Sequence, residues 1–239
     1  MNKPGAAKSW IRFCANGLLV IVALSATRAV PASAANYQFI NIADSSAEFS
    51  SNQFGGASIN NSGLVAFSGV RNGVQGIYAG SGGPIATIAD STGALSGLGS
   101  PESINDSGMV AFNASLDTGG EGLFTGSGGP ITPVIDSSGP FSYFNFAVIN
   151  NGGTIAFSAF LDGGGSGIYA TSGGAPMPIA ELGGDLSFVG FGEAVINNNG
   201  TVAFCGFSQG GTIARYGHLY RQWRSGEHDQ YLPVWWRTI

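Results

Sequence analysis

Short apolar runs alternate with polar, glycine-rich turns along most of this chain, and one nine-residue combination of the two recurs. Each copy reads Ile-Asn-x-x-Gly-x-(Val/Ile)-Ala-Phe, and the copies begin at Ile59, Ile104, Ile149 and Ile196. The steps between their asparagines are 45, 45 and 47 residues. A fixed period of this size is typical of repeat architectures, in which each unit buries its apolar face against its neighbours.

The motif predicts a strand end, a tight turn and a second strand. Asn, Asp, Ser and Gly gather in the turn because they tolerate left-handed backbone angles or hydrogen-bond their own backbone. The run after the turn, such as Leu64 to Phe67, is almost continuously apolar, which is typical of a strand buried on both faces. The alanine before each phenylalanine predicts that a neighbouring layer approaches closely on one face of the strand, and that the phenylalanine ring fills the space on the other face.

The rest of the period predicts further strands. One strand ends in an acid, and five residues beyond each acid comes an apolar residue: Phe49, Leu95, Phe141 and Leu186. A hairpin turn, Asn72-Gly73 in the first copy, leads into Gly-Ile-Tyr or Gly-Leu-Phe, then Ser-Gly-Gly, then another apolar strand. One period therefore holds about four short strands, as in a β-propeller blade. We expect an all-β fold of about four such units, either a whole propeller or a fragment of a larger ring.

The order of elements predicts what stands at the two ends. Residues 37 to 43 look like the last strand of a unit, and in a closed ring this strand would complete the final blade. Residues 207 to 239 form a divergent tail, in which Gly217-His218-Leu219-Tyr220 resembles a displaced Gly-Ile-Tyr strand. Arginines, tryptophans and both histidines gather there, so the tail is either an atypical cap or, after about residue 212, a frameshifted reading of a longer array. Translating the coding DNA in the other two frames tests the frameshift.

Composition agrees with many short strands. The chain has 239 residues, 44% hydrophobic and only 10% charged, with 40 glycines, and glycine weakens helix interiors. The net charge of −5 gives no basis for nucleic-acid binding.

Residues 1 to 35 are typical of a secretory signal peptide, with a basic start, a short apolar stretch and a small-residue cleavage site at Ala32-Ser33-Ala34. We therefore expect a secreted or extracytoplasmic protein with no membrane span after cleavage, and a repeat domain over residues 36 to 206. The mature chain would keep one cysteine, Cys205, at a strand position held by Ser68, Asn113 and Ser158 in the other copies. We expect a small strand residue there rather than a reactive nucleophile.

The motif resembles the NxxGxxAF tandem repeat of bacterial exported "choice-of-anchor" proteins. The matching residues are Asn60, Gly63, Ala66 and Phe67, then Asn105, Gly108, Ala111 and Phe112, then Asn150, Gly153, Ala156 and Phe157, then Asn197, Gly200, Ala203 and Phe204. The resemblance covers roughly residues 37 to 206. It implies export and a propeller-like β architecture, and it provides no catalytic residues. Unlike that family, this chain has no recognisable C-terminal anchor.

Repeated acids are the first candidates for chemistry: Asp44, Asp90, Asp136 and Glu181. Such carboxylates at loop ends suit Ca²⁺, but calcium needs six to eight convergent oxygens. We favour the alternative that each acid accepts backbone N–H bonds in a turn of its own unit. The recurring aromatics Tyr78, Phe124 and Tyr169 are interpreted as core, and as a carbohydrate-stacking platform only if they face outward. No catalytic residue set and no cofactor is predicted.

These patterns favour an exported, non-enzymatic repeat scaffold for binding or surface interaction, with no particular ligand indicated. A cell-surface or extracellular polysaccharide or protein is the candidate partner. Two alternatives stay open. One is a propeller-fold polysaccharide hydrolase or lyase, whose paired carboxylates would break the repeat pattern. The other is a self-assembling surface protein, because a ring left open exposes strand edges that can pair between chains.

Overall fold

The computed structural model describes residues 38–45, 48–50, 53–101, 103–182, 186–208, 217–222 and 231–233. The chain forms two compact units, Met1–Ile40 and Asn41–Ile239. The expected signal peptide lies outside the described residues. In the first unit, residues 38–40 are exposed and carry no secondary structure. The second unit holds the repeats, and its described part consists of strands and turns without a helix.

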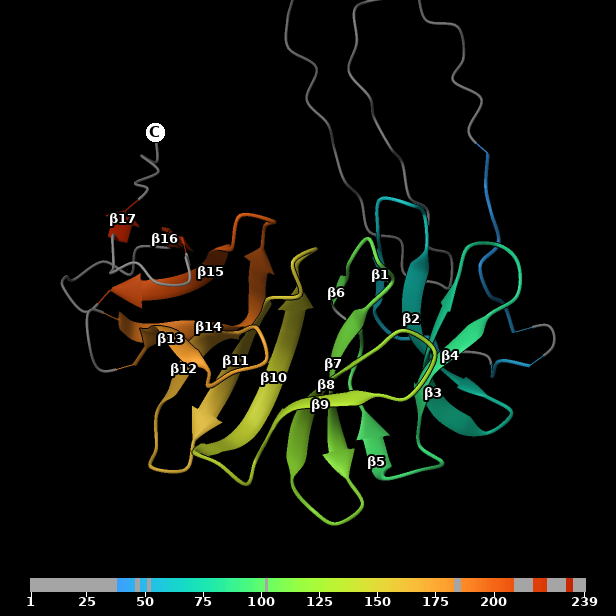
Figure 1. Cartoon of the computed structure of the whole chain (residues 1–239), viewed down its shortest axis with the longest axis horizontal. Coiled ribbons are helices and arrows are strands. Elements are labelled where there is room, and N and C mark those ends of the chain that lie inside the picture. The colour runs from blue at the N-terminus through green and yellow to red at the C-terminus, as the bar shows by residue number, and fades with distance from the viewer. Residues whose placement is uncertain are drawn as a thin grey trace, which may run out of the picture. The chain divides into compact units, whose positions relative to one another are not determined.

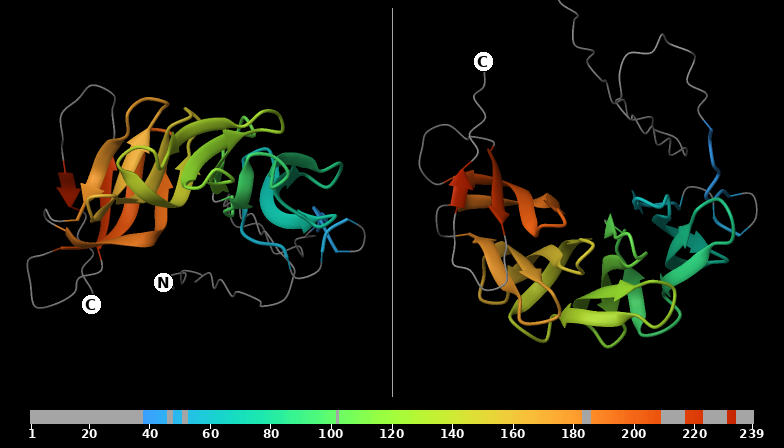
Figure 2. Two further views of the ribbon diagram at one scale, coloured as in Figure 1. Left: turned by 90° about the horizontal axis from the view of Figure 1, so that it is seen from below. Right: turned by 45° about the horizontal axis from the view of Figure 1, so that its top comes forward.

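The second unit contains four antiparallel sheets, which follow one another in chain order (Figures 1 and 2). We call each sheet a blade. Blade 1 consists of β1 (Ala57–Ile59), β2 (Val65–Arg71), β3 (Val74–Gly80) and β4 (Ala86–Asp90). Blade 2 consists of β5 (Leu95–Leu98), β6 (Ser103–Ile104), β7 (Val110–Leu116), β8 (Glu121–Gly126) and β9 (Thr132–Asp136). Blade 3 consists of β10 (Phe141–Ile149), β11 (Ile155–Leu161), β12 (Ser166–Thr171) and β13 (Met177–Glu181). Blade 4 consists of β14 (Leu186–Ile196), β15 (Thr201–Ser208), β16 (Gly217–Gln222) and β17 (Tyr231–Pro233).

The Asn-x-x-Gly turn occupies the same place in every blade, between the first strand and the second. In blade 1 the backbone N–H of Asn60 donates to the carbonyl of Leu64 at 3.1 Å, and that of Gly63 donates to Asn60 at 3.1 Å. Gly63 has φ +82°, and its three counterparts have φ between +79° and +81°. A side chain is strained in this left-handed region, so the motif requires glycine. In blade 2 the first strand is divided into β5 and β6, which both pair with β7. With that difference, the expected four-stranded unit with its turn at a constant position is confirmed.

In blades 2 to 4 the first strand begins at the apolar residue that follows the acid by five positions, and in blade 1 the equivalent Phe49 forms an isolated bridge before β1. These residues pair with the end of the second strand in one register: Phe49 with Arg71, Leu95 with Leu116, Phe141 with Leu161, and Leu186 with Ser208. The side chains of Phe49, Leu95 and Phe141 are buried. The expectation that this segment folds back onto the core is therefore confirmed.

Alternate faces of the second strand pack against different neighbours. In blade 2, Phe112 belongs to a core cluster shared with blade 1, whereas Ala111 belongs to a cluster shared with blade 3. Phe112, Phe157 and Phe204 thus face the preceding blade. Ala66, Ala111 and Ala156 face the following one. The four phenylalanines Phe67, Phe112, Phe157 and Phe204 are 5%, 1%, 0% and 3% exposed. The expected strand, buried on both faces with a small residue on one of them, is confirmed.

The Gly-Ile-Tyr pattern has a steric reason. A Cβ placed on Gly76 would lie 2.6 Å from the hydroxyl oxygen of Tyr78 and 3.0 Å from the backbone oxygen of Ala89. The aromatic ring two residues later therefore folds over the space that glycine leaves. In the preceding hairpin, Asn72 and Gly73 both have positive φ, 51° and 83°, as a type I′ turn requires.

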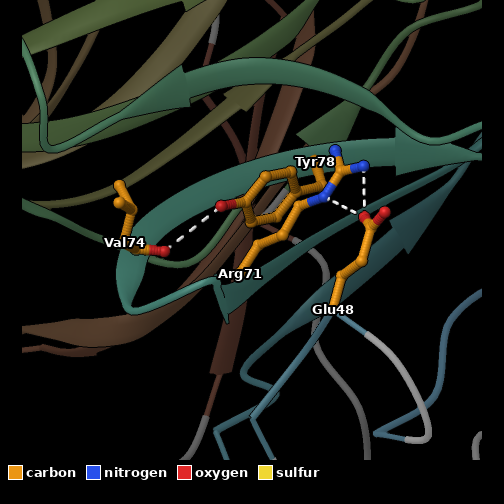
Figure 3. A network of polar contacts seen from close by, with 4 residues as sticks. All are labelled: Glu48, Arg71, Val74 and Tyr78. Atoms are coloured by element: carbon orange, nitrogen blue, oxygen red, sulfur yellow. Dashed lines mark hydrogen bonds and ion pairs between the residues drawn. The ribbon is translucent and has the colours of Figure 1, made fainter.

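The first blade is tied to the chain before it by an ion pair (Figure 3). Arg71 at the end of β2 forms hydrogen-bonded ion-pair contacts with Glu48, and its guanidinium lies 5.8 Å from the ring centre of Phe49. The backbone of Glu48 also accepts from Asn72 at 2.8 Å. Figure 3 also shows the hydroxyl of Tyr78 donating to the carbonyl of Val74, at 3.2 Å.

The expectation that residues 37 to 43 form a strand completing the final blade is wrong for the described residues 38 to 43. They form no strand, and Ile42 and Ala43 instead pack beside the cluster of Phe49, Phe67 and Tyr78. Blade 4 takes its outer strands β16 and β17 from the tail.

The tail strand β16 stands in the register of the other blades' third strands. Phe204 pairs with Leu219 as Phe67 pairs with Tyr78, so Gly217-His218-Leu219 occupies the Gly-Ile-Tyr position. The interpretation of this segment as a displaced version of that strand is confirmed. In the described part of the chain, no helix has the length and apolar character needed to cross a membrane.

Candidate functional site

The asparagine of each motif both closes its own turn and reaches the next blade. The Asn60 side-chain oxygen accepts the backbone N–H groups of Ser62 and Leu64, each at 3.0 Å. Its amide nitrogen donates to the backbone carbonyl of Asn105 in blade 2, at 3.0 Å. Because the acceptor is main chain, this bond needs only that the neighbouring turn be present.

The same bond joins every pair of consecutive blades. Asn105 donates to the carbonyl of Asn150 at 3.2 Å, and Asn150 donates to that of Asn197 at 3.0 Å. We call this series the asparagine ladder. Asn60, Asn105 and Asn150 are only 8%, 5% and 5% exposed, and buried amides need such partners. The ladder fixes how consecutive turns align.

A second, exposed row runs beside the ladder through the next residue of each motif: Asn61, Asp106, Asn151 and Asn198. Asp106 accepts from the backbone and side chain of Asn61 at 3.1 and 3.0 Å, and from the side chain of Asn151 at 2.6 Å. The hydrogen bonds from these two residues hold the pKa of Asp106 below its usual value. Its own backbone N–H donates to the side chain of Asn151 at 2.9 Å.

The repeated acids lie where the chain passes from one blade to the next. One carboxylate oxygen of Asp90 accepts the backbone and hydroxyl of Thr92 at 3.0 and 2.5 Å. Asp136 accepts in the same way from Ser138, and these bonds lower its pKa. Glu181 accepts from the hydroxyl of Tyr169 at 2.9 Å.

The fourth acid, Asp44, accepts from the side chain of Asn41. In the described part of the chain, no three His, Cys, Asp or Glu side chains gather as a metal site would require. The structure thus places Asp90 and Asp136 in the turn-capping role that the sequence favoured over calcium ligation. Each of the four acids has a hydrogen-bond partner in its own part of the chain.

The recurring aromatics lie inside the blades. Tyr78, Phe124 and Tyr169 are 2%, 6% and 3% exposed, so the interpretation as core is confirmed and these rings offer no stacking platform. Burial, followed by the hydrogen bond that the hydroxyl donates to Glu181, raises the pKa of Tyr169. The side chain of Cys205 lies outside the described residues.

A cleft of about 410 Å³ opens where blade 1 meets blade 2 on the side of their outer strands. One wall is β4 with the turn that follows it, including Thr87, Asp90 and Thr92. The other wall is the Ser-Gly-Gly turn between β8 and β9, where Gly128, Gly129 and Ile131 line the opening. Gly129 has open space around its Cβ position. No pattern in the sequence indicates this cleft, because its two walls come from different repeats.

Comparison with solved structures supports the β-propeller-like fold. TolB from Acinetobacter baumannii, a β-propeller, is similar over 71% of this chain with 17% identity and a TM-score of 0.50. The match covers 41% of the TolB chain, so this chain corresponds to less than half of that protein. This chain is thus a β-propeller-like repeat protein.

Residues 16–231 match a family model described as "Family of unknown function (DUF7453)". The chain belongs to this family. No curated protein matches it.

Proposed function

We propose that this protein is an exported, non-enzymatic propeller scaffold that binds a hydroxyl-rich extracellular ligand, a polysaccharide, in the cleft between blades 1 and 2. The cleft is the observation that carries the proposal. It places one carboxylate, on Asp90, beside the hydroxyl groups of Thr87 and Thr92 and the uncluttered backbone of Gly128 and Gly129. Carboxylates, hydroxyls and accessible backbone are groups that fix the orientation of a polar ligand.

The hydrogen bonds of the repeats support binding over catalysis. Asp90, Asp136 and Asp106 each accept from neighbouring turn residues, and the asparagine ladder holds one blade to the next. Asp136 and Asp106 are therefore engaged in holding the scaffold, whereas Asp90 uses one carboxylate oxygen for its turn and its second oxygen accepts no hydrogen bond among the described residues. General acid–base chemistry on a glycosidic bond needs two carboxylates facing one substrate, and the cleft is lined by one acid.

Export and family placement complete the proposal. The signal-like residues 1 to 35 support an extracytoplasmic location. The four phased motifs support membership of the NxxGxxAF exported proteins, whose anchors vary. Cell-surface polysaccharide is a ligand available in that compartment.

A binding measurement with matched variants tests the proposal. The protein is titrated with soluble neutral and acidic bacterial polysaccharides in a calorimeter, and new reducing ends are assayed in the same samples. Gly129→Tyr fills the cleft without a backbone clash, whereas Gly83→Tyr places the same side chain at the equivalent turn of blade 1, where there is also open space. We expect binding without cleavage, weakened about tenfold or more by Gly129→Tyr and unchanged by Gly83→Tyr.

Two results would overturn the proposal. New reducing ends would make the protein an enzyme. Equal affinity of the Gly129→Tyr and Gly83→Tyr variants would place the ligand elsewhere.

A further inference from the structure

Blade 4 exposes on its outward face residues whose counterparts in blade 3 are buried. Val195 is 63% exposed, whereas Val148 at the same register position is 7% exposed. Asn197 is exposed where Asn150 is buried. Ala203, which pairs with Val195, is partly exposed, while Ala66, Ala111 and Ala156 are each 0% exposed. In blade 3 the following blade covers these positions.

Blade 1 exposes the complementary set on its opposite side. Ile59 is 44% exposed, although its counterparts Ile104 and Ile149 are 6% and 4% exposed. Ile149 packs in a cluster that includes Ala111 and Leu123 of the preceding blade. Phe54, against the rings of Phe49 and Phe67, is also 41% exposed. The first blade therefore has an apolar face shaped like those that elsewhere contact a preceding blade.

The asparagine ladder has a direction and two unused ends. The carbonyl of Asn105 accepts both the Gly108 N–H and the Asn60 side chain, at 2.9 and 3.0 Å. The carbonyl of Asn60 accepts only the Gly63 N–H among the described residues. At the other end, the side-chain nitrogen of Asn197 has no partner in the described part of the chain. Among the described residues, the blade 1 end of the ladder thus lacks a donor and the blade 4 end lacks an acceptor.

We propose that blade 4 of one molecule docks against blade 1 of a second copy of this chain, so that the asparagine ladder continues between molecules. Asn197 of one copy donates to the carbonyl of Asn60 in the other. Val195 packs near Ile59, as Val148 and Ile196 share one cluster at the joint of blades 3 and 4. The second copy is the fitting occupant because it carries both complementary ends with the polarity of the internal joints.

This interface is heterologous, because different faces of the two copies meet. Such a contact produces a closed ring when the rotation between copies closes, and a filament when it does not. In the ring and in the filament, the contact between blade 4 of one copy and blade 1 of the next is the same. The inference goes beyond the proposed ligand binding and does not depend on it, since the cleft of blades 1 and 2 lies within one copy.

Engineered cysteines test the direction of the contact. The side chains of Asn61 and Asp106 hydrogen-bond across the joint of blades 1 and 2, so residue 198 of one copy should stand beside residue 61 of the other. Asn61→Cys and Asn198→Cys are made separately in a Cys205→Ser background. We expect a disulfide-linked dimer when the two proteins are mixed and oxidised, and none when either is oxidised alone. Cross-linking of a single variant with itself would indicate a two-fold contact and overturn the proposal, as would the absence of any cross-link in the mixture.

A second measurement tests the ladder itself. Asn197→Asp keeps the oxygen that caps the turn but removes the donating amide, and Asn199→Asp makes the same charge change in the same turn outside the ladder. Sedimentation equilibrium of the wild type should show self-association, weakened about tenfold or more by Asn197→Asp and much less by Asn199→Asp. A monomeric wild type, or equal effects of the two variants, would contradict the inference.

Discussion

Replacing Asn105 by alanine removes four hydrogen bonds, three accepted by its side-chain oxygen and one donated to Asn150. The residue is 5% exposed, so water replaces these bonds poorly. At about 1 kcal/mol for each neutral bond, we expect the free energy of unfolding to fall by about 4 kcal/mol. Asn197→Ala, measured at a protein concentration at which the chain is monomeric, is the matched control, because within one molecule that side chain is exposed and accepts two backbone N–H groups without donating to another blade. Its expected cost is about 1–2 kcal/mol.

Urea unfolding followed by far-UV circular dichroism measures both variants, with the slope of the transition checked for a change in the unfolded state. Asn105→Asp separates the two roles, because it keeps the capping oxygen and loses the donor. The free energy of unfolding of Asn105→Asp should lie between those of the wild type and of Asn105→Ala. If Asn105→Ala and Asn197→Ala cost the same within about 0.5 kcal/mol, the bond between blades contributes nothing and the ladder reasoning fails.

Three further outcomes follow from packing and charge. Phe112→Ala should cost about 3–5 kcal/mol because the ring is fully packed between blades, and a loss below about 1 kcal/mol in the same unfolding assay would contradict this. Gly76→Ala should lower the melting temperature because its Cβ would meet Tyr78, whereas Gly83→Ala, in open space, should leave it unchanged; equal melting temperatures would refute the steric reason. The pKa of Asp106 is depressed in the folded state, so its stabilisation is complete above its unfolded pKa of about 4 and is lost as the pH falls through the folded value. The stability difference between the wild type and Asp106→Asn should therefore shrink below about pH 4, and a difference independent of pH would exclude this carboxylate as its source.

Much of the fold could be predicted because each repeat carries its local rules. Left-handed glycines at Gly63 and Gly73 mark turns, and the Val-Ala-Phe run marks a strand buried on both faces. The likeness of Gly217-His218-Leu219 to the Gly-Ile-Tyr segment, rather than the phase of the repeat, indicates the third strand of blade 4. These features can be predicted because they depend on residues close in sequence or on the regular spacing of the repeats.

The contacts between repeats could not be predicted in the same way. The motif asparagine looks like a turn residue, and nothing in one repeat indicates that its amide reaches a carbonyl 45 residues away. For residues 38 to 43 the order of elements predicts a strand, whereas in the structure Ile42 and Ala43 pack beside the aromatic cluster of blade 1. The cleft at Asp90 and Gly129 likewise combines two repeats, and no single pattern contains both walls.

The uneven period also has a structural explanation. The last step of the ladder spans 47 residues instead of 45, and β14 has 11 residues where β10 has 9. The additional residues fall at a bulge, between Val189 and Ala194, where the register to the second strand shifts. Bulges absorb inserted residues without disturbing the pairing on either side. The motif itself keeps its length.

The main-chain acceptor in each ladder bond has a consequence for how such genes change. A side chain that recognises a backbone carbonyl makes no demand on the identity of the residue that carries it. A duplicated or deleted repeat can therefore join either neighbour at once, provided that it brings its own asparagine and left-handed glycine. Unequal recombination between copies would yield joints that are already formed, and selection would then act on surface loops rather than on repairing the core. The number of repeats can thus change without new contacts having to evolve between blades.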